Sequence, residues 1–549
     1  MSRPPALPIA LGAAAVLAWL ASQPPAARGP DAPATEFAAA RALADIRVLA
    51  AQPHPLGSPA HEAAADYLLG RMRALGLEVR VQDAVEGGRP VRNLIGVLPG
   101  RERAAAPVAL MAHYDTVPGS PGAADDSTGV ACALEVARAL RAGGAPRRDV
   151  ALVITDGEEI DLLGARALYA SDPLAPRLGA VLNMEARGGG GRVFMFETSE
   201  ANGALIDLFR RVTPGPSSNS FAVFVYRHMP NDTDLTIVRA HGGAGLNYAF
   251  IGRQVDYHSP GSTVARLDAR SVQHMGAQVL AMARALADAD ALPPRAPDRV
   301  YADILGLGVV AYAPARGWLV LAAAIALLAG AAQRLRAARL LAWRPLARGA
   351  LAALLVLPLA AGLALLARRL TGIPHDFAGE RPLLAAFGLY EFALAACGLG
   401  SAGLLAAWAG PRSPGAWLGA LLPALLGAVA AQALVPAVAF LPAWPLLLAA
   451  LGLAWLCRDP AAARATGPAA GWPVIVGAAL AGAQCLYLAH AVLLSVGARL
   501  PAAAGLFAWL GAMSLFPLLQ PARNRGRAAA AWTASILAGL ALAAALRLV

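Results

Sequence analysis

The first 300 residues alternate between short apolar runs and longer segments in which apolar residues recur every three or four positions. Short runs of this kind are typical of buried strands, and the longer pattern is typical of amphipathic helices. Helices are predicted over 36–51, 60–76, 128–142, 160–171, 202–212 and 267–289, and strands over 93–98, 107–113, 149–155, 179–185, 192–197 and 246–251. The alternation predicts one α/β domain over 36–292, with a mixed, mostly parallel sheet between helices.

After residue 317 the pattern changes to about eight long apolar segments, each long enough to span a bilayer. They cover 318–333, 349–367, 383–409, 415–435, 437–457, 471–497, 500–520 and 528–547. We therefore expect an all-α polytopic membrane domain over 318–549, joined to the α/β domain by a linker over 293–317. Residues 1–23 contain another apolar stretch, which is either a transmembrane anchor or a cleaved signal peptide, and we favour the anchor. A proline-rich linker follows over 24–35.

The net charge of +11 belongs to the second half of the chain, because residues 1–300 carry 29 Arg against 30 acids and the rest carries 17 Arg against five acids. The chain has no Lys, and its wealth of Ala, Arg, Gly and Pro fits a GC-rich bacterial coding sequence. The arginines of the second half separate apolar segments and form no basic and aromatic patches, so they indicate membrane topology and not nucleic-acid binding. The four cysteines suggest no disulfide framework and no thiolate metal site.

The distribution of these arginines predicts an orientation. If the N-terminus is cytoplasmic, the inward side holds Arg334, Arg336, Arg339, Arg344, Arg348, Arg412, Arg458, Arg464, Arg523, Arg525 and Arg527. The outward side then holds only Arg316, Arg368, Arg369, Arg381, Arg499 and Arg547. We therefore expect an integral protein of a bacterial inner membrane, in contact with membrane lipid, with its α/β domain on the periplasmic side.

Two acidic positions and one histidine surround the end of the strand predicted over 107–113. His113 and Asp115 lie where that strand ends, and the following loop brings Asp125 to the start of the next helix, with Ser127 or Thr128 as a plausible cap. Ligands of open α/β sheets bind at such strand ends, and a His and an Asp spaced this way can approach one metal ion. Taken alone, the stretch is also compatible with an ordinary charged turn, although we favour the metal site.

A second strand, over 149–155, leads into the adjacent acids Glu158 and Glu159. Neighbouring carboxylates repel each other when both are ionised, and a dication relieves that repulsion. One of the pair can then bind the metal while the other accepts a proton from water. The alternative is a solvated acidic pair at a helix start, which the helix dipole favours.

Glu185 ends a further apolar strand, and His258 lies in a loop after the last one. A single Glu or His of this kind is more often structural. Together, however, the candidates form an imidazole and carboxylate set that suits catalytic zinc: His113, Asp125, Glu159, Glu185 and His258. Five ligands, one of them bridging, are enough for two Zn²⁺ ions roughly 3.5–4 Å apart.

In their order along the chain, these motifs resemble those of the dinuclear-zinc aminopeptidases. The motifs are His113-Tyr-Asp115, Gly122-Ala-Ala-Asp-Asp-Ser-Thr-Gly129, Glu158-Glu159, Asn183-Met-Glu185 and Tyr257-His258. Two more, Pro53-His-Pro-Leu-Gly-Ser-Pro-Ala60 and Pro230-Asn-Asp-Thr-Asp234, resemble the membrane subgroup that includes vacuolar membrane protease and endoplasmic reticulum metallopeptidase. The resemblance implies a zinc-exopeptidase fold and terminal hydrolysis of a peptide substrate.

The resemblance also implies a role for each matching residue. Asp125 would bridge the two ions, His113 and Glu185 would complete one site, and Glu159 and His258 the other. Glu158 would be the general base. Asp115 would accept a hydrogen bond from His113 and fix its tautomer, since ligating histidines usually have such a partner. Tyr257 would donate to the oxyanion, although a packed core tyrosine is an equal alternative. Glu185 stands where soluble relatives often have Asp.

Several features leave other functions open. The loop Arg187-Gly-Gly-Gly-Gly-Arg192 lacks the ending of a phosphate loop, so we expect a site wall, where Arg187 could meet a substrate carboxylate. Glu391 and His490 lie within predicted spans and are either functional or satisfied by a neighbouring helix. The alternatives to an aminopeptidase are a carboxypeptidase, a non-catalytic receptor or assembly subunit, and a transporter with an accessory domain. The natural substrate and the oligomeric state cannot be inferred.

Overall fold

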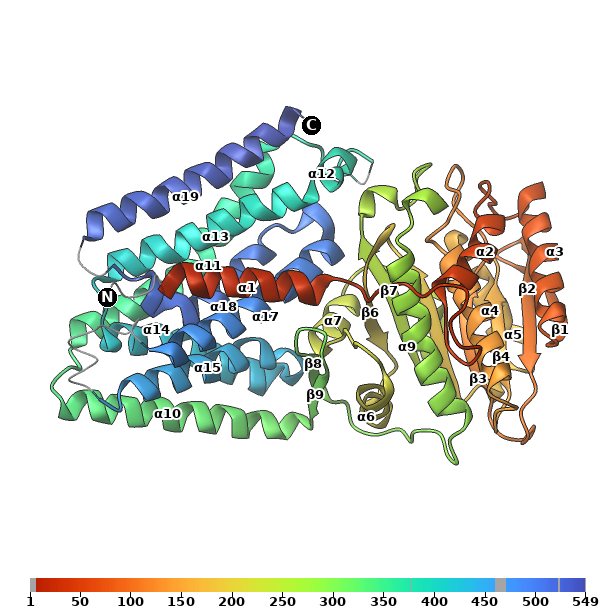
Figure 1. Ribbon diagram of the computed structural model, residues 1–549, viewed down its shortest axis with the longest axis horizontal. Helices are drawn as coiled ribbons and strands as arrows, with labels where there is room; N and C mark the ends of the chain where they lie inside the picture. Colours follow the sequence, from red (N-terminus) through yellow and green to blue (C-terminus); the bar gives the residue numbers. More distant parts are fainter. Residues whose placement is uncertain (1–5, 377, 460–470, 522–523, 549) are drawn as a thin grey trace. The chain divides into compact units, whose positions relative to one another are not determined.

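A seven-stranded sheet in the order β1-β2-β4-β3-β5-β7-β6 forms the centre of the α/β unit in the computed structural model of the protein (Figure 1). Its strands are β1 (Glu78–Glu86), β2 (Arg89–Leu98), β3 (Val108–His113), β4 (Val150–Thr155), β5 (Ala180–Ala186), β6 (Gly190–Thr198) and β7 (Gly245–Gly252). β3 is parallel to β4 and β5, and β5 is parallel to β7, whereas β1, β2 and β6 pair antiparallel with their neighbours. The predicted fold class is therefore confirmed, and the carboxyl ends of the four central strands share one edge.

The structure describes residues 6–376, 378–459, 471–521 and 524–548. These fall into two compact units, one of residues 23–311 and one that combines residues 1–22 with 312–549. Arg464 and Arg523, which enter the predicted orientation, lie outside the described residues.

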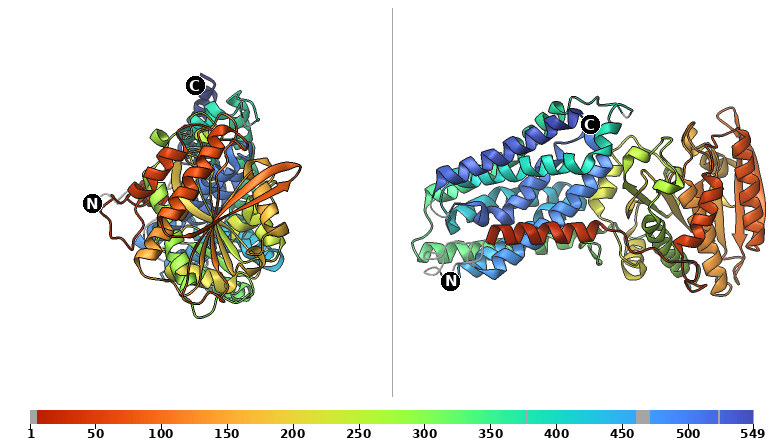
Figure 2. Two further views of the ribbon diagram at one scale, coloured as in Figure 1. Left: turned by 90° about the vertical axis from the view of Figure 1, so that its right-hand side faces the viewer. Right: turned by 45° about the horizontal axis from the view of Figure 1, so that its top comes forward.

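Both faces of the sheet are covered, which explains the continuous apolar runs of the central strands. In β3, Val108, Leu110 and Ala112 pack into a large core, while Ala109 and Met111 pack into a second core on the opposite face. The large core includes side chains of α2 (Ala39–Leu49), α3 (Pro59–Ala74), α4 (Ser127–Ala142) and α9 (Ala269–Ala287), and the second includes side chains of α5 (Leu163–Ser171) and α8 (Asp234–Ala240). Figure 2 shows the strands fanning out with the usual twist of such a sheet.

The remaining elements of this unit are short. α6 (Gly203–Val212) has apolar residues on one face, and α7 (Ser220–Tyr226) packs near β6. A separate two-stranded sheet is formed by β8 (Val300–Asp303) and β9 (Val309–Tyr312). The sequence analysis missed β1, α7, α8, β8 and β9.

The other unit is helical, and each of the eight predicted apolar segments contains one of its helices. Among the described residues these are α10 (Gly317–Ala337), α11 (Trp343–Leu370), α13 (Phe387–Ala409), α14 (Pro414–Leu434), α15 (Phe440–Leu456), α17 (Trp472–Val496), α18 (Ala503–Leu519) and α19 (Arg525–Ala545). Six helices in the described part of the chain are long and apolar enough to cross a membrane. α15, α18 and the N-terminal α1 (Ala6–Ser22) have 17 residues each, so their spanning stays a prediction.

Small residues bring distant segments of the helical unit together. α1 packs against α17, where a methyl group on Gly482 would lie 3.2 Å from Cβ of Ala14.

The short α12 (Arg381–Ala385) precedes α13. His490 on α17 lies with Nδ1 2.9 Å from Oε1 of Glu391 on α13. The two ionisable residues of the predicted spans are therefore partners of each other.

Candidate metal centre

His113 is the last residue of β3, and Asp115 lies two residues beyond it, both buried. His113 Nδ1 is 3.0 Å from the main-chain carbonyl oxygen of Asp115 and 3.4 Å from its carboxylate. A proton on Nδ1 would donate to these acceptors and would leave the lone pair of Nε2 directed toward the centre, as metal binding requires. The carboxylate of Asp115 accepts from the main-chain N–H groups of Glu158, at 3.0 Å, and Glu159, at 3.3 Å. Asp115 thus ties the end of β3 to the loop after β4.

Asp125 lies in the loop that leads from β3 to α4. Its Oδ1 is 3.2 Å from Nε2 of His113, and its Oδ2 is 3.1 Å from Nε2 of His258. One carboxylate therefore faces both imidazoles, one with each oxygen. This is the geometry that a bridging ligand requires.

The residue that caps α4 is Asp126, so the prediction of Ser127 or Thr128 as the cap is wrong. Asp126 Oδ1 accepts from the N–H of Gly129 at 2.9 Å, because the helix begins one residue earlier than the apolar pattern indicated. The hydroxyl of Thr128 instead donates to the carbonyl of Ala123 at 2.8 Å. Asp126 Oδ2 is buried and has no hydrogen-bond partner among the described residues.

The loop after β4 brings both glutamates into the centre. Gly157 adopts a left-handed conformation with φ 62°, and a single 3₁₀ turn over Glu158–Ile160 follows. Glu159 Oε1 is 3.0 Å from Nε2 of His258, whereas Glu158 Oε2 is 3.8 Å from Nε2 of His113. The adjacent acids therefore face different imidazoles.

Glu185 and His258 complete the arrangement from β5 and from the loop after β7. Glu185 Oε2 is 3.7 Å from Nε2 of His113, and Glu185 Oε1 accepts from the side-chain amide of Asn183 at 3.0 Å. His258 follows the 3₁₀ turn Gln254–Asp256 and has a φ of 49°. All of the predicted ligands thus converge at the carboxyl edge of the sheet.

The charges at this centre are unbalanced without a metal ion. Burial raises the pKa of Glu158 and of Glu185 well above the usual range, and neighbouring carboxylates raise it further. Burial alone would lower the pKa of His258, but hydrogen bonds with Asp125 and Glu159 outweigh it and raise the pKa to about 10. A divalent cation supplies the missing positive charge and would keep these carboxylates ionised.

The donor set also fits a metal by position. Two groups have donor atoms within 4.8 Å of one another: His113 with Asp125 and Glu159, and His113 with Asp126 and Glu185. The unpartnered Oδ2 of Asp126 is consistent with such a role. The sequence analysis missed Asp126 as a donor because its neighbour Asp125 already accounted for the motif. Imidazole and carboxylate donors without thiolates suit zinc in a catalytic site.

Tyr257 and Arg187 stand beside these ligands. The ring of Tyr257 stacks on that of His258 with centroids 3.7 Å apart, and the guanidinium carbon of Arg187 is 5.9 Å from the centre of the Tyr257 ring. Burial raises the pKa of Tyr257 well above its usual range. The phenol therefore keeps its proton, as an oxyanion donor must. Its role in the reaction stays a prediction.

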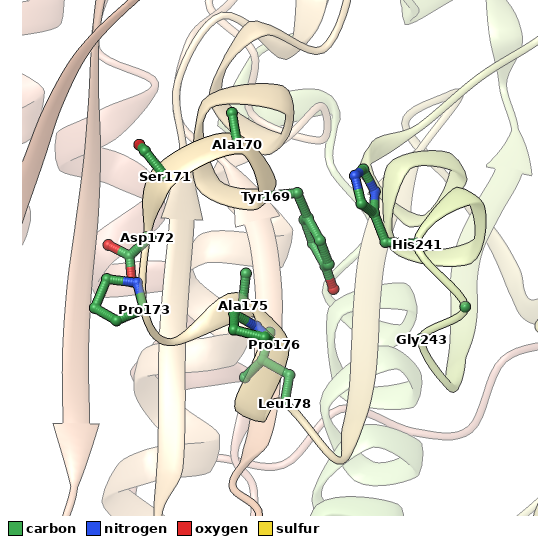
Figure 3. Close-up of a pocket in the computed structure, with 11 residues that line it drawn as sticks. Tyr169, Ala170, Ser171, Asp172, Pro173, Ala175, Pro176, Leu178, His241 and Gly243 are labelled. Carbon is green, nitrogen blue, oxygen red and sulfur yellow. The ribbon is translucent and has the colours of Figure 1, made fainter.

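A pocket of about 520 Å³ lies elsewhere in this unit (Figure 3). It is lined by residues 169–173, 175, 176, 178 and 241–243, which precede β5 and β7, so it lies at the amino ends of these strands. Tyr169 and His241 stack within it, with centroids 4.7 Å apart. The pocket contains none of the candidate ligands.

Residues 93–283, which contain every candidate ligand, match the model of Peptidase family M28. This segment is a Peptidase family M28 domain. The resemblance inferred from the motifs is thereby confirmed.

The M28 domain is similar to endoplasmic reticulum metallopeptidase 1 of Mus musculus, with 32% identity over 230 residues that cover 40% of this chain and 26% of the relative. Vacuolar membrane protease of Candida dubliniensis is 28% identical over 246 residues, which cover 42% of this chain and 26% of that protein. The chain thus spans about a quarter of the length of these relatives. Among solved structures, an aminopeptidase from Aneurinibacillus sp. strain AM-1 aligns with 13% identity and a TM-score of 0.39, covering 48% of this chain and 98% of that one.

Proposed function

We propose that the protein is a membrane-bound zinc metallopeptidase, an aminopeptidase that removes residues from the free amino end of peptides. The observation that carries this proposal is the convergence of two imidazoles on the two oxygens of Asp125, with Glu159 and Glu185 beside them and Glu158 at the same edge. The M28 match supports it. The peptidase domain would comprise residues 36–292 and the membrane domain residues 318–549.

Two zinc ions per domain would be held by the five candidate ligands, with Asp125 shared, His113 and Glu185 on one ion and Glu159 and His258 on the other. Bound zinc would supply Lewis-acid polarisation of water and of the scissile carbonyl. Glu158 would accept a proton from water and return it to the leaving amine. Tyr257 would donate a hydrogen bond to the carbonyl oxygen as negative charge develops there.

For its location, we propose that the α/β unit faces the periplasm of a bacterial inner membrane, with α1 retained as an anchor. The helical unit supports an integral membrane protein. The side of the membrane follows from the distribution of arginines alone.

The decisive test combines metal analysis with a peptide scan on the full chain. The wild type should hold two zinc ions and cleave peptides with a free amino terminus but not N-blocked ones. Asp125→Ala should lose both ions together, because each imidazole faces one oxygen of that carboxylate. Full zinc content in this variant would refute the bridging role, and zinc binding without any hydrolysis would favour a non-catalytic receptor.

A further inference from the structure

A line of buried polar side chains, connected by hydrogen bonds, begins at Glu185 and extends away from the candidate metal centre. Asn183 Nδ2 donates to Glu185 Oε1 at 3.0 Å and to Asn247 Oδ1 at 3.1 Å. Asn247 Nδ2 donates to Glu197 Oε2 at 3.0 Å, and Arg239 Nη1 donates to Glu197 Oε1 at 2.5 Å. The side chains of Asn183, Asn247 and Glu197 are fully buried. The chain of hydrogen bonds therefore has a carboxylate at each end and two amides between.

One atom in this line is left without a partner. Asn183 uses its amide nitrogen for both hydrogen bonds, and its buried Oδ1 accepts none from the described residues. An unsatisfied buried acceptor is unfavourable. Some other interaction must hold Asn183 in this orientation.

A side-chain amide has two orientations that exchange its donor and its acceptor. If Asn247 turned over, its nitrogen would face Asn183, which could then turn and pair its own oxygen. That change would bring the oxygen of Asn247 against Glu197 and the oxygen of Asn183 against Glu185. Ionised carboxylates accept hydrogen bonds only, so Glu197 opposes the first turn and Glu185 opposes the second. Glu197 therefore reinforces, through Asn247, the orientation of Asn183 that Glu185 favours.

The charge of Glu197 is maintained by Arg239. Burial raises the pKa of Glu197, and the hydrogen bonds from Asn247 and Arg239 work against that shift. Arg239 is nearer the surface, with 18% of its side chain exposed, and also pairs with Glu200. Thr233, from the Pro230-Asn-Asp-Thr-Asp234 motif, accepts a second hydrogen bond from Asn247 Nδ2 at 2.8 Å. The motif therefore supports the same orientation.

We propose that Glu197 and Arg239 are positioning residues for Glu185, which act through the fixed orientations of Asn247 and Asn183. They hold the donor of Asn183 on Glu185 and so set the affinity for the ion that Glu185 binds. This inference rests on the two-ion centre proposed above. Direct hydrogen-bond partners of metal ligands typically change metal affinity about 10–100-fold when they are replaced, and this range is the upper limit for residues that act through two amides.

The test is a chelator-buffered zinc titration of the full chain. Glu197→Gln introduces a donor of nearly the same shape, and Arg239→Gln removes the cation that holds Glu197 ionised. In both variants one zinc dissociation constant should rise several-fold, up to about 10-fold, while the other stays unchanged. Arg239→Lys keeps the charge and should retain most of the affinity.

The matched control is Arg227→Gln. Arg227 also lies near Glu200, at 3.9 Å, and donates to the carbonyl of Thr198, but it makes no hydrogen bond in the line to Glu185. Its charge also lowers the pKa of Glu197, but less than that of Arg239 does, so its replacement should change the zinc constants much less than Arg239→Gln. An equal effect of Arg227→Gln and Arg239→Gln would overturn the proposal, because it would indicate a general loss of positive charge.

Double variants identify the affected ion. Adding Glu197→Gln to Glu185→Gln should cause no further loss of zinc affinity, because residues that act on one site are not additive. Adding it to Glu159→Gln should weaken binding of the remaining ion as much as Glu197→Gln does alone. Additive losses of affinity in the first combination would overturn the proposal. Weaker binding of both ions in Glu197→Gln alone would also overturn it, because that result indicates a structural role.

A wild type that binds no zinc would refute the two-ion centre itself. Normal binding of both ions in Glu197→Gln would refute only this inference.

Discussion

Two adjacent glutamates after β4 have the same side chain and different surroundings. Glu159 contacts His258 at 3.0 Å, as a ligand sharing an ion with that imidazole would. Glu158 lies farther from its nearest imidazole, at 3.8 Å. This difference supports separate roles for the two residues, with Glu159 as a metal ligand and Glu158 as the general base.

Glu158→Gln should therefore remove turnover while it preserves the metal. Glutamine has nearly the same shape but cannot accept a proton from water. General-base catalysis contributes about 10²–10⁴-fold, so kcat should fall by at least that order. The measurement is zinc stoichiometry together with kcat on one aminoacyl substrate.

Glu159→Gln is the matched comparison, because it makes the same chemical change one residue away. It should weaken one ion's coordination, lower zinc affinity as well as rate, and recover partly in excess zinc. If Glu158→Gln lost its zinc while Glu159→Gln kept it, the two roles would have to be exchanged.

At the scale of single residues, the sequence predicts which side chains are candidate metal ligands, but it predicts poorly which residues contact them. His113 and Glu185 were identifiable because each ends an apolar strand. Asp126 was missed because one acid of a pair accounted for the motif, and its free oxygen is visible only in three dimensions. The role of Asn247 depends on Asn183 and Glu197, which are 64 and 50 residues away in the chain. No local pattern contains that information.

Among the elements, the central strands were the most predictable, because burial on both faces gives a continuous apolar run. β1 was missed because it lies at the edge of the sheet and its exposed positions, other than Val85, are charged, so it lacks a continuous apolar run. α7 and α8 were missed because each has only seven residues, which is too short for a helical period to be recognised. The structure places Asp125, Glu158, Glu159 and His258 in loops or short turns after these strands, and His113 and Glu185 in the strands themselves.

The loop after β4 depends on a contact with the start of α3. His61 Nε2 is 2.7 Å from Oδ1 of Asp156, two residues before Glu158, and both side chains are buried. The ring of His61 stacks on Tyr114, with centroids 4.5 Å apart. Ser58, from the Pro53–Ala60 motif, caps α3 by accepting from the N–H of His61 at 3.2 Å. This motif therefore connects a helix start to the loop that carries both glutamates.

His61→Ala should destabilise the α/β unit by roughly 1–3 kcal/mol, because Asp156 Oδ1 would lose its partner in a buried site. At about 2–4 °C per kcal/mol for a domain of this size, the melting temperature should fall by several degrees. The measurement is thermal unfolding of the full chain. His241→Ala serves as the control, because His241 is exposed, and its effect should stay within about 0.5 kcal/mol. Equal shifts for the two variants would contradict the role assigned to His61.

At the scale of the whole molecule, the change in composition near residue 300 lies close to the boundary between the two compact units, after Ala311, but it leaves the count of spans open. The structure has a helix in each predicted segment, yet α15 and α18 have only 17 residues, about 25 Å at 1.5 Å per residue, and the hydrocarbon core of a bilayer is about 30 Å thick. Hydropathy alone cannot decide whether such helices cross. Both helices pack against longer neighbours, α14 and α17, within the helical unit.

The orientation is therefore best tested with reporters placed between helices that the structure defines. Fusions at Pro293 and at Asp376, after α11, should report the outside, and fusions at Leu340, between α10 and α11, and at Arg412, between α13 and α14, should report the cytoplasm. The physical reason is the excess of arginines, eleven against six, on the side assigned to the cytoplasm. A phosphatase active only outside and a fluorescent protein bright only inside give opposite signals at each position. If Pro293 and Leu340 reported the same side, α10 would not cross the membrane, and if all four signals were inverted, the α/β unit would face the cytoplasm.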